Sequence, residues 1–103
     1  MNVRQISDML NGKQKRYLRS LAVNEKAIFQ IGKDGLNDNL YTSLKEALKA
    51  RELVKVSVLK TCETDMHEIA VELCANTGAE LVQTIGKTLV LYKRSKERKI
   101  ILP

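Results

Sequence analysis

Residues 27–58 decide the fold; they read AIFQIGKDGLNDNLYTSLKEALKARELVKVSV. The stretch opens with a short apolar run, residues 27–31, that is typical of a buried strand. Apolar residues then recur at helical spacing from about residue 37 to residue 50. A second strand is indicated where polar residues alternate with Val54, Val56 and Val58. A strand, a helix and a strand in succession predict two parallel strands joined by a right-handed crossover.

Both flanks of this unit carry clear helix signals. On the N-terminal side, Asn11 is expected to cap a first helix, and Gln14 stands where a capping box needs a glutamine or glutamate. On the C-terminal side, Asp65 is expected to cap a third helix, and Gly78 supplies its stop. The chain therefore predicts three helices.

Two further strands complete the pattern. They are expected at about residues 79–85 and 88–93, joined by Gly86-Lys87 as a tight hairpin turn. The element order is then α-β-α-β-α-β-β. This order predicts a compact mixed α/β domain of the α+β kind, in which helices pack on a four-stranded mixed sheet.

The charge of the chain is strongly positive and unevenly distributed. Eighteen Lys and Arg stand against twelve Asp and Glu among 103 residues, for a net charge of +6. Residues 1–35 carry +4, residues 36–84 carry −3, and residues 85–103 carry +5. A fold that brings the two basic ends together would present a positive face, which attracts polyanions and most often nucleic acid. The alternative is a basic surface that serves only solubility.

Several classes of protein are disfavoured by the composition. No apolar run approaches the roughly 18 residues of a transmembrane helix, and residues 1–12 lack the apolar region of a signal peptide. Two cysteines fall short of the disulfide framework of a small secreted domain. We therefore expect a cytoplasmic protein that does not bind membranes.

The first predicted helix has one apolar and one cationic face. At 100° per residue its apolar side holds Tyr17, Leu18, Leu21 and Ala22. Its other side holds Lys15, Arg16 and Arg19, with Lys13 at the edge. Packing of the apolar side would leave three or four cations in solvent, as candidates for RNA contact. Tyr17 is expected to pack in the core rather than to stack on bases.

The turn Gly32-Lys33-Asp34-Gly35 lies between a predicted strand and a predicted helix. Glycines allow close approach of a ligand to the backbone, and the start of a helix favours an anion. Lys33 adds a cation, whereas Asp34 should repel phosphate. The alternative is a turn with a purely structural role, which is common for glycines at such junctions.

The C-terminal segment is the densest run of charge. Residues 93–99 contain five basic side chains, Lys93 and Arg94 among them. The run is either a solvated extension or an RNA contact. Residues 100–103, Ile-Ile-Leu-Pro, are too apolar for a free tail, so we expect them to fold back on the domain.

Catalytic and metal chemistry find little support in the sequence. His67, the single histidine, has no partner for nucleophilic catalysis and is expected on an exposed helix surface. Cys62 and its acidic neighbours lack the close pairs of a zinc site. Cys62 is expected in a loop, where its thiol could react, and Cys74 in the core. We expect no enzyme activity, no metal, no cofactor and no small-molecule substrate.

Four segments together resemble the CRM domain, the RNA-binding module of chloroplast splicing factors and of small stand-alone bacterial proteins of the YhbY type. Three of them read LNGKQKRYLR, QIGKDG and QTIGKTLVLYK, at residues 10–19, 30–35 and 83–93. The fourth, RELVKV at residues 51–56, is similar to the family's entry into its second strand. The resemblance covers about residues 10–103.

The resemblance implies a fold similar to the C-terminal domain of translation initiation factor three, and a GxxG loop that contacts RNA as in KH domains. It implies one CRM RNA-binding domain over residues 1–103, with its core at about 10–93 and a basic extension at 94–103. It also implies association with precursors of the large ribosomal subunit, as expected of the bacterial members of the family. The RNA-binding residues it implies are Gly32, Lys33, Asp34, Gly35, Lys13, Lys15, Arg16 and Arg19, with Lys93 and Arg94 as tail candidates. Asp34 departs from the family's usual loop, which is more basic or neutral there.

Two functions remain open from the sequence. The first is a monomeric RNA-binding protein that binds large-subunit rRNA or its precursors and assists ribosome assembly. The second is a ribosome-associated interaction module that docks mainly on a protein partner, which Asp34 and the acidic segment 36–84 favour. An RNA-processing enzyme ranks last, because no acid–base pair or metal constellation is visible.

Overall fold

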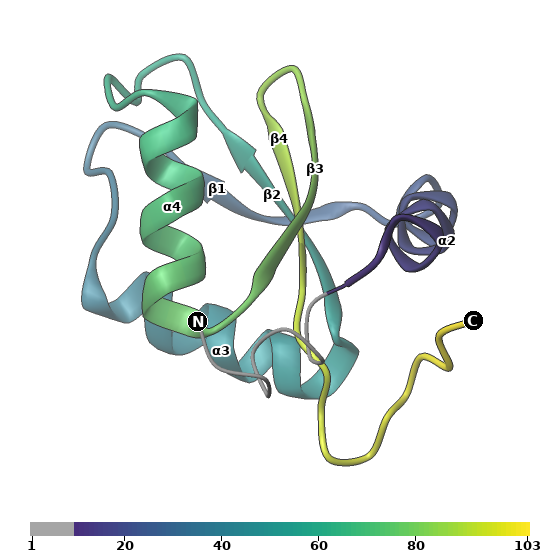
Figure 1. Ribbon diagram of the computed structural model, residues 1–103. Helices are drawn as coiled ribbons and strands as arrows, with labels where there is room; N and C mark the ends of the chain where they lie inside the picture. Colours follow the sequence, from purple (N-terminus) through teal and green to yellow (C-terminus); the bar gives the residue numbers. More distant parts are fainter. Residues whose placement is uncertain (1–9) are drawn as a thin grey trace.

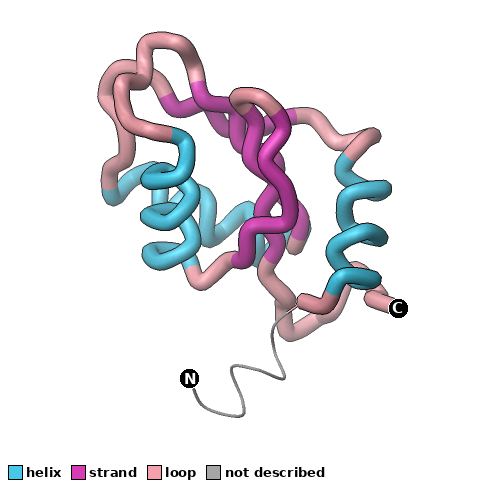
Figure 2. Tube along the Cα trace, turned by 45° about the horizontal axis from the view of Figure 1, so that its top comes forward, coloured by secondary structure: helices cyan, strands magenta, loops and turns pink. Residues whose placement is uncertain are grey.

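The computed structural model describes residues 10–103 and shows a three-layer α/β domain (Figure 1). The elements are α2 (Gly12–Ala22), β1 (Ala27–Ile31), α3 (Asp38–Arg51), β2 (Leu53–Val58), α4 (Met66–Thr77), β3 (Glu80–Ile85) and β4 (Thr88–Tyr92). The order predicted from the sequence is confirmed. Figure 2 shows α2 on one face of the sheet and α3 with α4 on the other.

The sheet has the strand order β1-β2-β4-β3. β1 and β2 are parallel, as the crossover through α3 requires, and the pairs β2–β4 and β3–β4 are antiparallel. The predicted mixed four-stranded sheet is therefore confirmed. β1 and β3 form its two edges.

Local signals set the ends of the helices. The Asn11 side chain accepts a hydrogen bond from Gln14 N at 2.8 Å, and the Gln14 side chain accepts one from Asn11 N at 3.1 Å. This is the predicted capping box. Asp65 caps α4 through His67 N at 3.1 Å, and Gly78 ends that helix in the left-handed region with φ +77°.

Two hydrophobic cores lie on the two faces of the sheet. The larger core fills the space under α3 and α4, where Val54, Val56 and Val58 of β2 all point. The smaller core lies under α2 and contains Leu10, Leu18, Ala22, Leu53, Val82, Val90 and Tyr92. Each fully buried large aliphatic side chain contributes about 1.5–3 kcal/mol. The smaller core therefore attaches α2 to the sheet less strongly than the larger core attaches α3 and α4.

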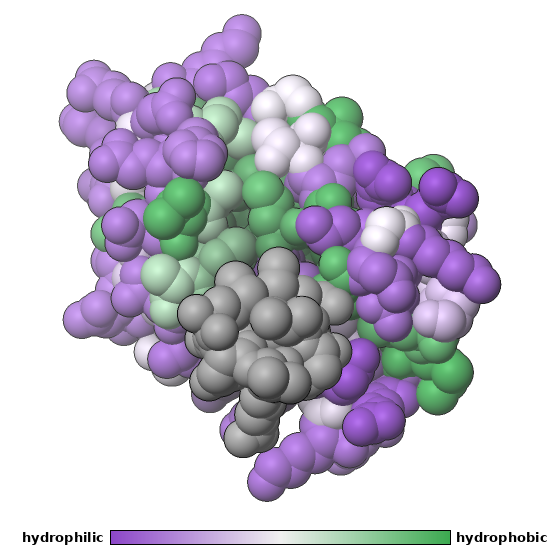
Figure 3. Space-filling view, viewed as in Figure 1, coloured by the Kyte–Doolittle hydropathy of each residue, from purple (hydrophilic) through white to green (hydrophobic). Residues whose placement is uncertain are grey.

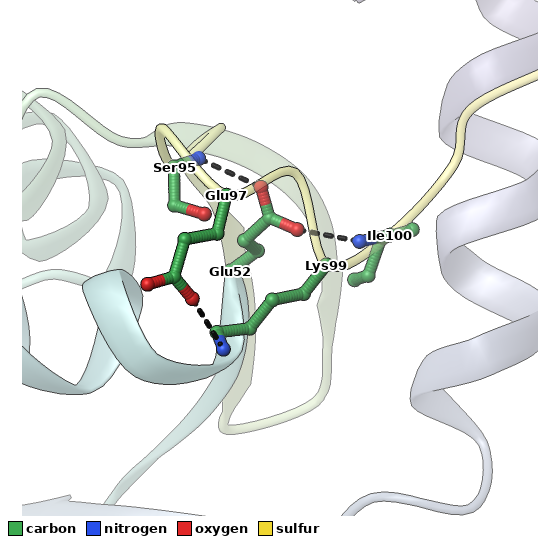
Figure 4. Close-up of polar contacts among 5 residues, drawn as sticks. All are labelled: Glu52, Ser95, Glu97, Lys99 and Ile100. Atoms are coloured by element: carbon green, nitrogen blue, oxygen red, sulfur yellow. Dashed lines mark hydrogen bonds and ion pairs between the residues drawn. The ribbon is translucent and has the colours of Figure 1, made fainter.

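Glu52 is a fully buried acid at the junction between α3 and β2. Its backbone φ is +66°, a region that residues other than glycine seldom adopt. Its carboxylate accepts hydrogen bonds from Ser95 N at 2.7 Å and Ile100 N at 2.6 Å (Figure 4). Its backbone N–H donates to Leu48 O at 2.8 Å, and its carbonyl accepts from Lys93 N at 2.9 Å. One residue therefore ends a helix and fixes the C-terminal segment.

The C-terminal segment folds back on the domain, as its apolar residues predicted. Ile100 and Leu102 pack against the smaller core beside α2. Gln14 Nε2 also donates to Pro103 O at 3.4 Å. Between these contacts and Glu52 the segment makes a turn, in which Arg98 N donates to Ser95 O at 3.2 Å.

Replacement of Glu52 by alanine should lower the free energy of unfolding by about 2–5 kcal/mol, because two partly buried N–H groups lose their acceptor. Glu52→Gly removes the same acceptor but relieves the positive φ, so it should be about 1 kcal/mol less destabilising than the alanine variant. Urea denaturation of both variants measures the difference. Glu63→Ala, at an exposed acid, is the control. A loss below about 0.5 kcal/mol for Glu52→Ala would contradict a stabilising role.

Candidate nucleic-acid interface

The outer face of α2 carries the predicted cations. Leu18 and Ala22 are buried, so the opposite side of the helix faces solvent. Lys13, Arg16 and Arg19 are exposed and Lys15 is half-buried. We call Lys13, Lys15, Arg16 and Arg19 the helix patch. Figure 3 shows mainly hydrophilic residues on this side of the molecule, with hydrophobic residues among them and between it and α4.

The tail cations differ in what they contact. The Lys93 ammonium donates to Thr77 O at 2.9 Å, at the C-terminal end of α4, where a cation stabilises the helix dipole. Arg94 is exposed and forms no ion pair within residues 10–103. The structure therefore gives Lys93 a structural contact, while Arg94 faces solvent.

The Gly32–Gly35 turn is tightly closed, with Gly35 N donating to Gly32 O at 3.0 Å. Gly35 has φ +65°, a conformation that favours glycine. At Gly32 a Cβ atom would lie 3.2 Å from Thr61 Oγ1 of the neighbouring loop, a tight contact that the Thr61 side chain would have to relieve. Lys33 and Asp34 are exposed at the tip. A glycine is therefore favoured at each of the two positions by a different structural constraint. The two charged residues between them face solvent.

Two lysines that the sequence analysis missed lie at the same end of the sheet as Lys33. The loop after β2 is tied to β1 by Leu59 N, which donates to Ile31 O at 2.8 Å. The β3–β4 hairpin is tied to β2 through Val58 N and Lys87 O at 2.7 Å. Lys60 and Lys87 in these loops are exposed. We call Lys33, Lys60 and Lys87 the turn patch.

The helix patch and the turn patch lie apart. β1 connects them, because α2 leads into its first residue and the Gly32–Gly35 turn leaves its last. Five extended residues span about 16 Å, and Figure 1 shows the two sites at opposite ends of β1. Exposed Ile28 and Gln30 lie along this edge strand between the patches. An extended nucleic-acid strand that follows β1 can reach both.

Four other side chains that the sequence singled out differ in how deeply they are buried. Tyr17 is 38% exposed and belongs to neither core, so the expectation that it packs inside was wrong. Cys62 is buried in the larger core, which corrects the expectation of an accessible thiol. His67 is exposed on α4, as predicted. Cys74 packs against the larger core, and burial, with the nearby charge of Glu80, raises the pKa of its thiol.

Residues 10–103 contain neither a cluster of metal ligands nor a membrane-spanning helix. In this range no three His, Cys, Asp or Glu side chains are grouped so that they could hold a metal ion. Over the same residues, no helix is long and apolar enough to cross a membrane.

Comparison with known proteins identifies the family of this chain. Residues 10–93 match the model of the CRS1 / YhbY (CRM) domain. The chain is 57% identical over 93 residues to "Probable RNA-binding protein YqeI" of Bacillus subtilis, covering 90% of this chain and 97% of that protein. It is 37% identical over 94 residues to an RNA-binding protein of Haemophilus influenzae, covering 91% and 95% of the two chains.

A solved structure is also similar. The solution structure of protein SAV1595 from Staphylococcus aureus superposes with a TM-score of 0.78 at 53% identity, and covers 92% of this chain and all of that one. Sequence and fold therefore lead to one conclusion: this chain belongs to the CRS1/YhbY (CRM) domain family.

Proposed function

We propose that this protein binds large-subunit rRNA or its precursors in the cytoplasm and assists ribosome assembly. The observation that carries the proposal is the exposed helix patch, on the side of α2 opposite the buried Leu18 and Ala22. Relatives across nearly the whole chain are named as RNA-binding proteins. The large-subunit role is what the CRM resemblance implies.

The mechanism we propose has two steps. The helix patch and Arg94 capture RNA phosphates, and the release of counterions from the RNA drives this association. The Gly32–Gly35 turn then holds the backbone of a locally unpaired segment, with Lys33 on a phosphate and the start of α3 favouring the negative charge. Asp34 limits the strength of this second contact.

The protein acts in this proposal as one monomeric domain over residues 1–103, and by binding rather than by catalysis. It has four aromatic side chains, three Tyr and one Phe, and Phe29 and Tyr92 pack into the cores. A platform of stacked aromatic residues, as in RRM domains, therefore has few residues to build on. Recognition should depend mainly on the RNA backbone and its shape.

One observation favours the second candidate, docking on a protein partner. The outer face of α4, remote from the helix patch, exposes Val71 at 50% between the acidic residues Glu68 and Glu72. An apolar side chain with acidic neighbours suits a basic protein surface. On this alternative the helix patch is incidental to ribosome association.

Neutralisation of the helix patch separates the two candidates. Lys15→Gln, Arg16→Gln and Arg19→Gln together should weaken binding to a large-subunit rRNA fragment by on the order of ten- to hundredfold at low salt. The slope of log affinity against log salt should become shallower by about 2, at about 0.7 per lost phosphate contact. Fluorescence anisotropy across a salt series measures both quantities.

The matched control is Lys45→Gln, Lys49→Gln and Arg51→Gln, which removes three exposed cations from α3 instead. This variant should keep most of the affinity. If the two triple variants lose binding equally, the helix patch has no special role and RNA contact is a property of net charge alone.

Adjacent substitutions in the turn should have opposite effects. Lys33→Gln removes a phosphate contact and should weaken RNA binding several-fold, whereas Asp34→Asn removes a repulsion and should strengthen it about two- to threefold. Both side chains are exposed, so thermal midpoints should stay unchanged. If neither variant alters the affinity, the turn is structural only.

The ribosomal target is tested in cells. Tagged protein should sediment with precursors of the large subunit in a density gradient and leave them in the Lys15/Arg16/Arg19 variant. A Val71→Ser variant on α4 should sediment as wild type does. Migration with the small subunit, or loss caused by Val71→Ser alone, would contradict the RNA-mediated assembly role.

A further inference from the structure

The face of the sheet that carries α2 extends beyond that helix. The strand residues that pack under α2 in the smaller core are Leu53, Val82, Val90 and Tyr92. From this core the strands continue toward the turn patch, and Figure 1 shows the β3–β4 hairpin extending past α2. The part of this face next to the turn patch therefore lies outside the smaller core.

One row of paired residues crosses all four strands in this part of the face. From β1 to β3 the row consists of Gln30, Ser57, Thr88 and Ile85. Paired residues share a face of a sheet, and Thr88 is two positions from Val90 of the smaller core, so the row lies on the same face as α2. Because neighbouring strands are about 4.8 Å apart, the row is about 14 Å long. We call these four residues the cross-strand row.

The cross-strand row is accessible to a ligand. Gln30 is exposed, and Ser57 and Thr88 are half-buried. Ile85 is 54% exposed at the β3 edge. The first three carry an amide or a hydroxyl group that can both donate and accept hydrogen bonds, whereas Ile85 offers apolar surface. This combination suits a ligand with flat groups that have polar edges.

The charge beside the row favours an anionic ligand. The turn patch runs across the same end of the sheet, since Lys33 follows β1, Lys60 follows β2 and Lys87 lies between β3 and β4. In the next row toward α2, Lys55 is half-buried, and its ammonium donates to the neutral Glu25 carbonyl at 3.0 Å. Lysines therefore flank the cross-strand row on two sides, which suits a polyanion better than a basic protein.

Acidic side chains are few on this face. Among the residues of the four described strands, Glu80 is the one acid. It pairs with Tyr92, two rows away from the cross-strand row, and its carboxylate accepts Leu10 N at 3.1 and 3.3 Å. The acids of the adjoining loops are exposed to solvent: Glu25, Asp34 and Glu63. The row itself is therefore neutral.

We propose that the cross-strand row binds the bases of an unpaired RNA segment whose phosphates lie on the turn patch. Gln30, Ser57 and Thr88 form hydrogen bonds with the base edges, and Ile85 packs against the face of a base. The segment must be unpaired, because the bases of a duplex direct these edges at the partner strand. The inference rests on the proposed function for RNA as the ligand. It goes further by assigning where the bases lie and by requiring a single strand that crosses the sheet.

The test is binding of the full chain to a short unstructured RNA that contains all four bases, measured by fluorescence anisotropy across a salt series. Ser57→Ala with Thr88→Val removes both hydroxyl groups and changes no charge. This double variant should bind the RNA about fivefold more weakly. The slope of log affinity against log salt should stay as in wild type, because no phosphate contact is lost.

The matched control is Ser43→Ala with Thr84→Val, which removes the same groups elsewhere. Ser43 is exposed on α3. Thr84 is exposed on β3 and lies on the opposite face of the sheet, since it pairs with Leu89 of the larger core. This variant should bind RNA as wild type does.

A further variant avoids the half-buried positions. Gln30 is exposed, so Gln30→Ala should leave the thermal midpoint unchanged. It should still weaken binding to the single strand about threefold, because the base edge loses an amide partner. The thermal midpoint of each variant shows whether a loss of binding reflects a loss of folding.

The same RNA paired with its complement distinguishes base contacts from backbone contacts. Duplex binding should be equal in wild type and in the Ser57/Thr88 variant. A loss as large for the duplex as for the single strand, or equal losses in the Ser57/Thr88 and Ser43/Thr84 variants, would overturn the inference.

The remaining outcomes separate this inference from the proposed function. If the row variants keep full affinity for the single strand while the Lys15/Arg16/Arg19 variant loses it, the cross-strand row does not bind bases and the proposed function stands. If the row variants bind RNA as wild type does but leave the large-subunit precursors in a density gradient, a protein covers the row and the inference is wrong. If the wild type binds neither the single strand nor the rRNA fragment, the proposed function fails and the inference fails with it.

Discussion

The buried carboxylate of Glu52 is the contact on which much of the architecture depends. An isolated charge inside a protein costs several kcal/mol unless hydrogen bonds compensate it. Here two backbone N–H groups of the C-terminal segment do so. The same residue ends α3 and opens β2, so it joins the larger core to the segment that completes the smaller one. The packing of Ile100 and Leu102 beside α2 follows from this junction.

The sheet divides the cations of the molecule into separate groups. The helix patch lies on one face, the turn patch lies where β1 and β2 end, and the tail cations lie where β4 ends. A positive charge spread in this way attracts polyanions from several directions. On the proposed function, it suits an RNA that contacts more than one side of the domain.

Much of the fold could be predicted from the sequence because its signals are local. The capping box at Asn11, the stop at Gly78 and the alternating valines of β2 each depend on a few neighbouring residues. Strand order is not local, so the approach of Lys60 and Lys87 to Lys33 could not be predicted. Glu52 offered no sign of burial, because a glutamate next to a strand is usually solvated. The engagement of Lys93 by Thr77 likewise depends on the tertiary fold.

The two cores differ in when they can form during synthesis. The buried residues of the larger core lie between Ile31 and Leu91. The smaller core joins Leu18 of α2 to Val82, Val90 and Ile100, far later in the chain. α2, the first element of the described residues, is therefore among the last of them to find its packing partners. Until then its apolar side is exposed, and its cations are free to interact with the surface on which it is being made.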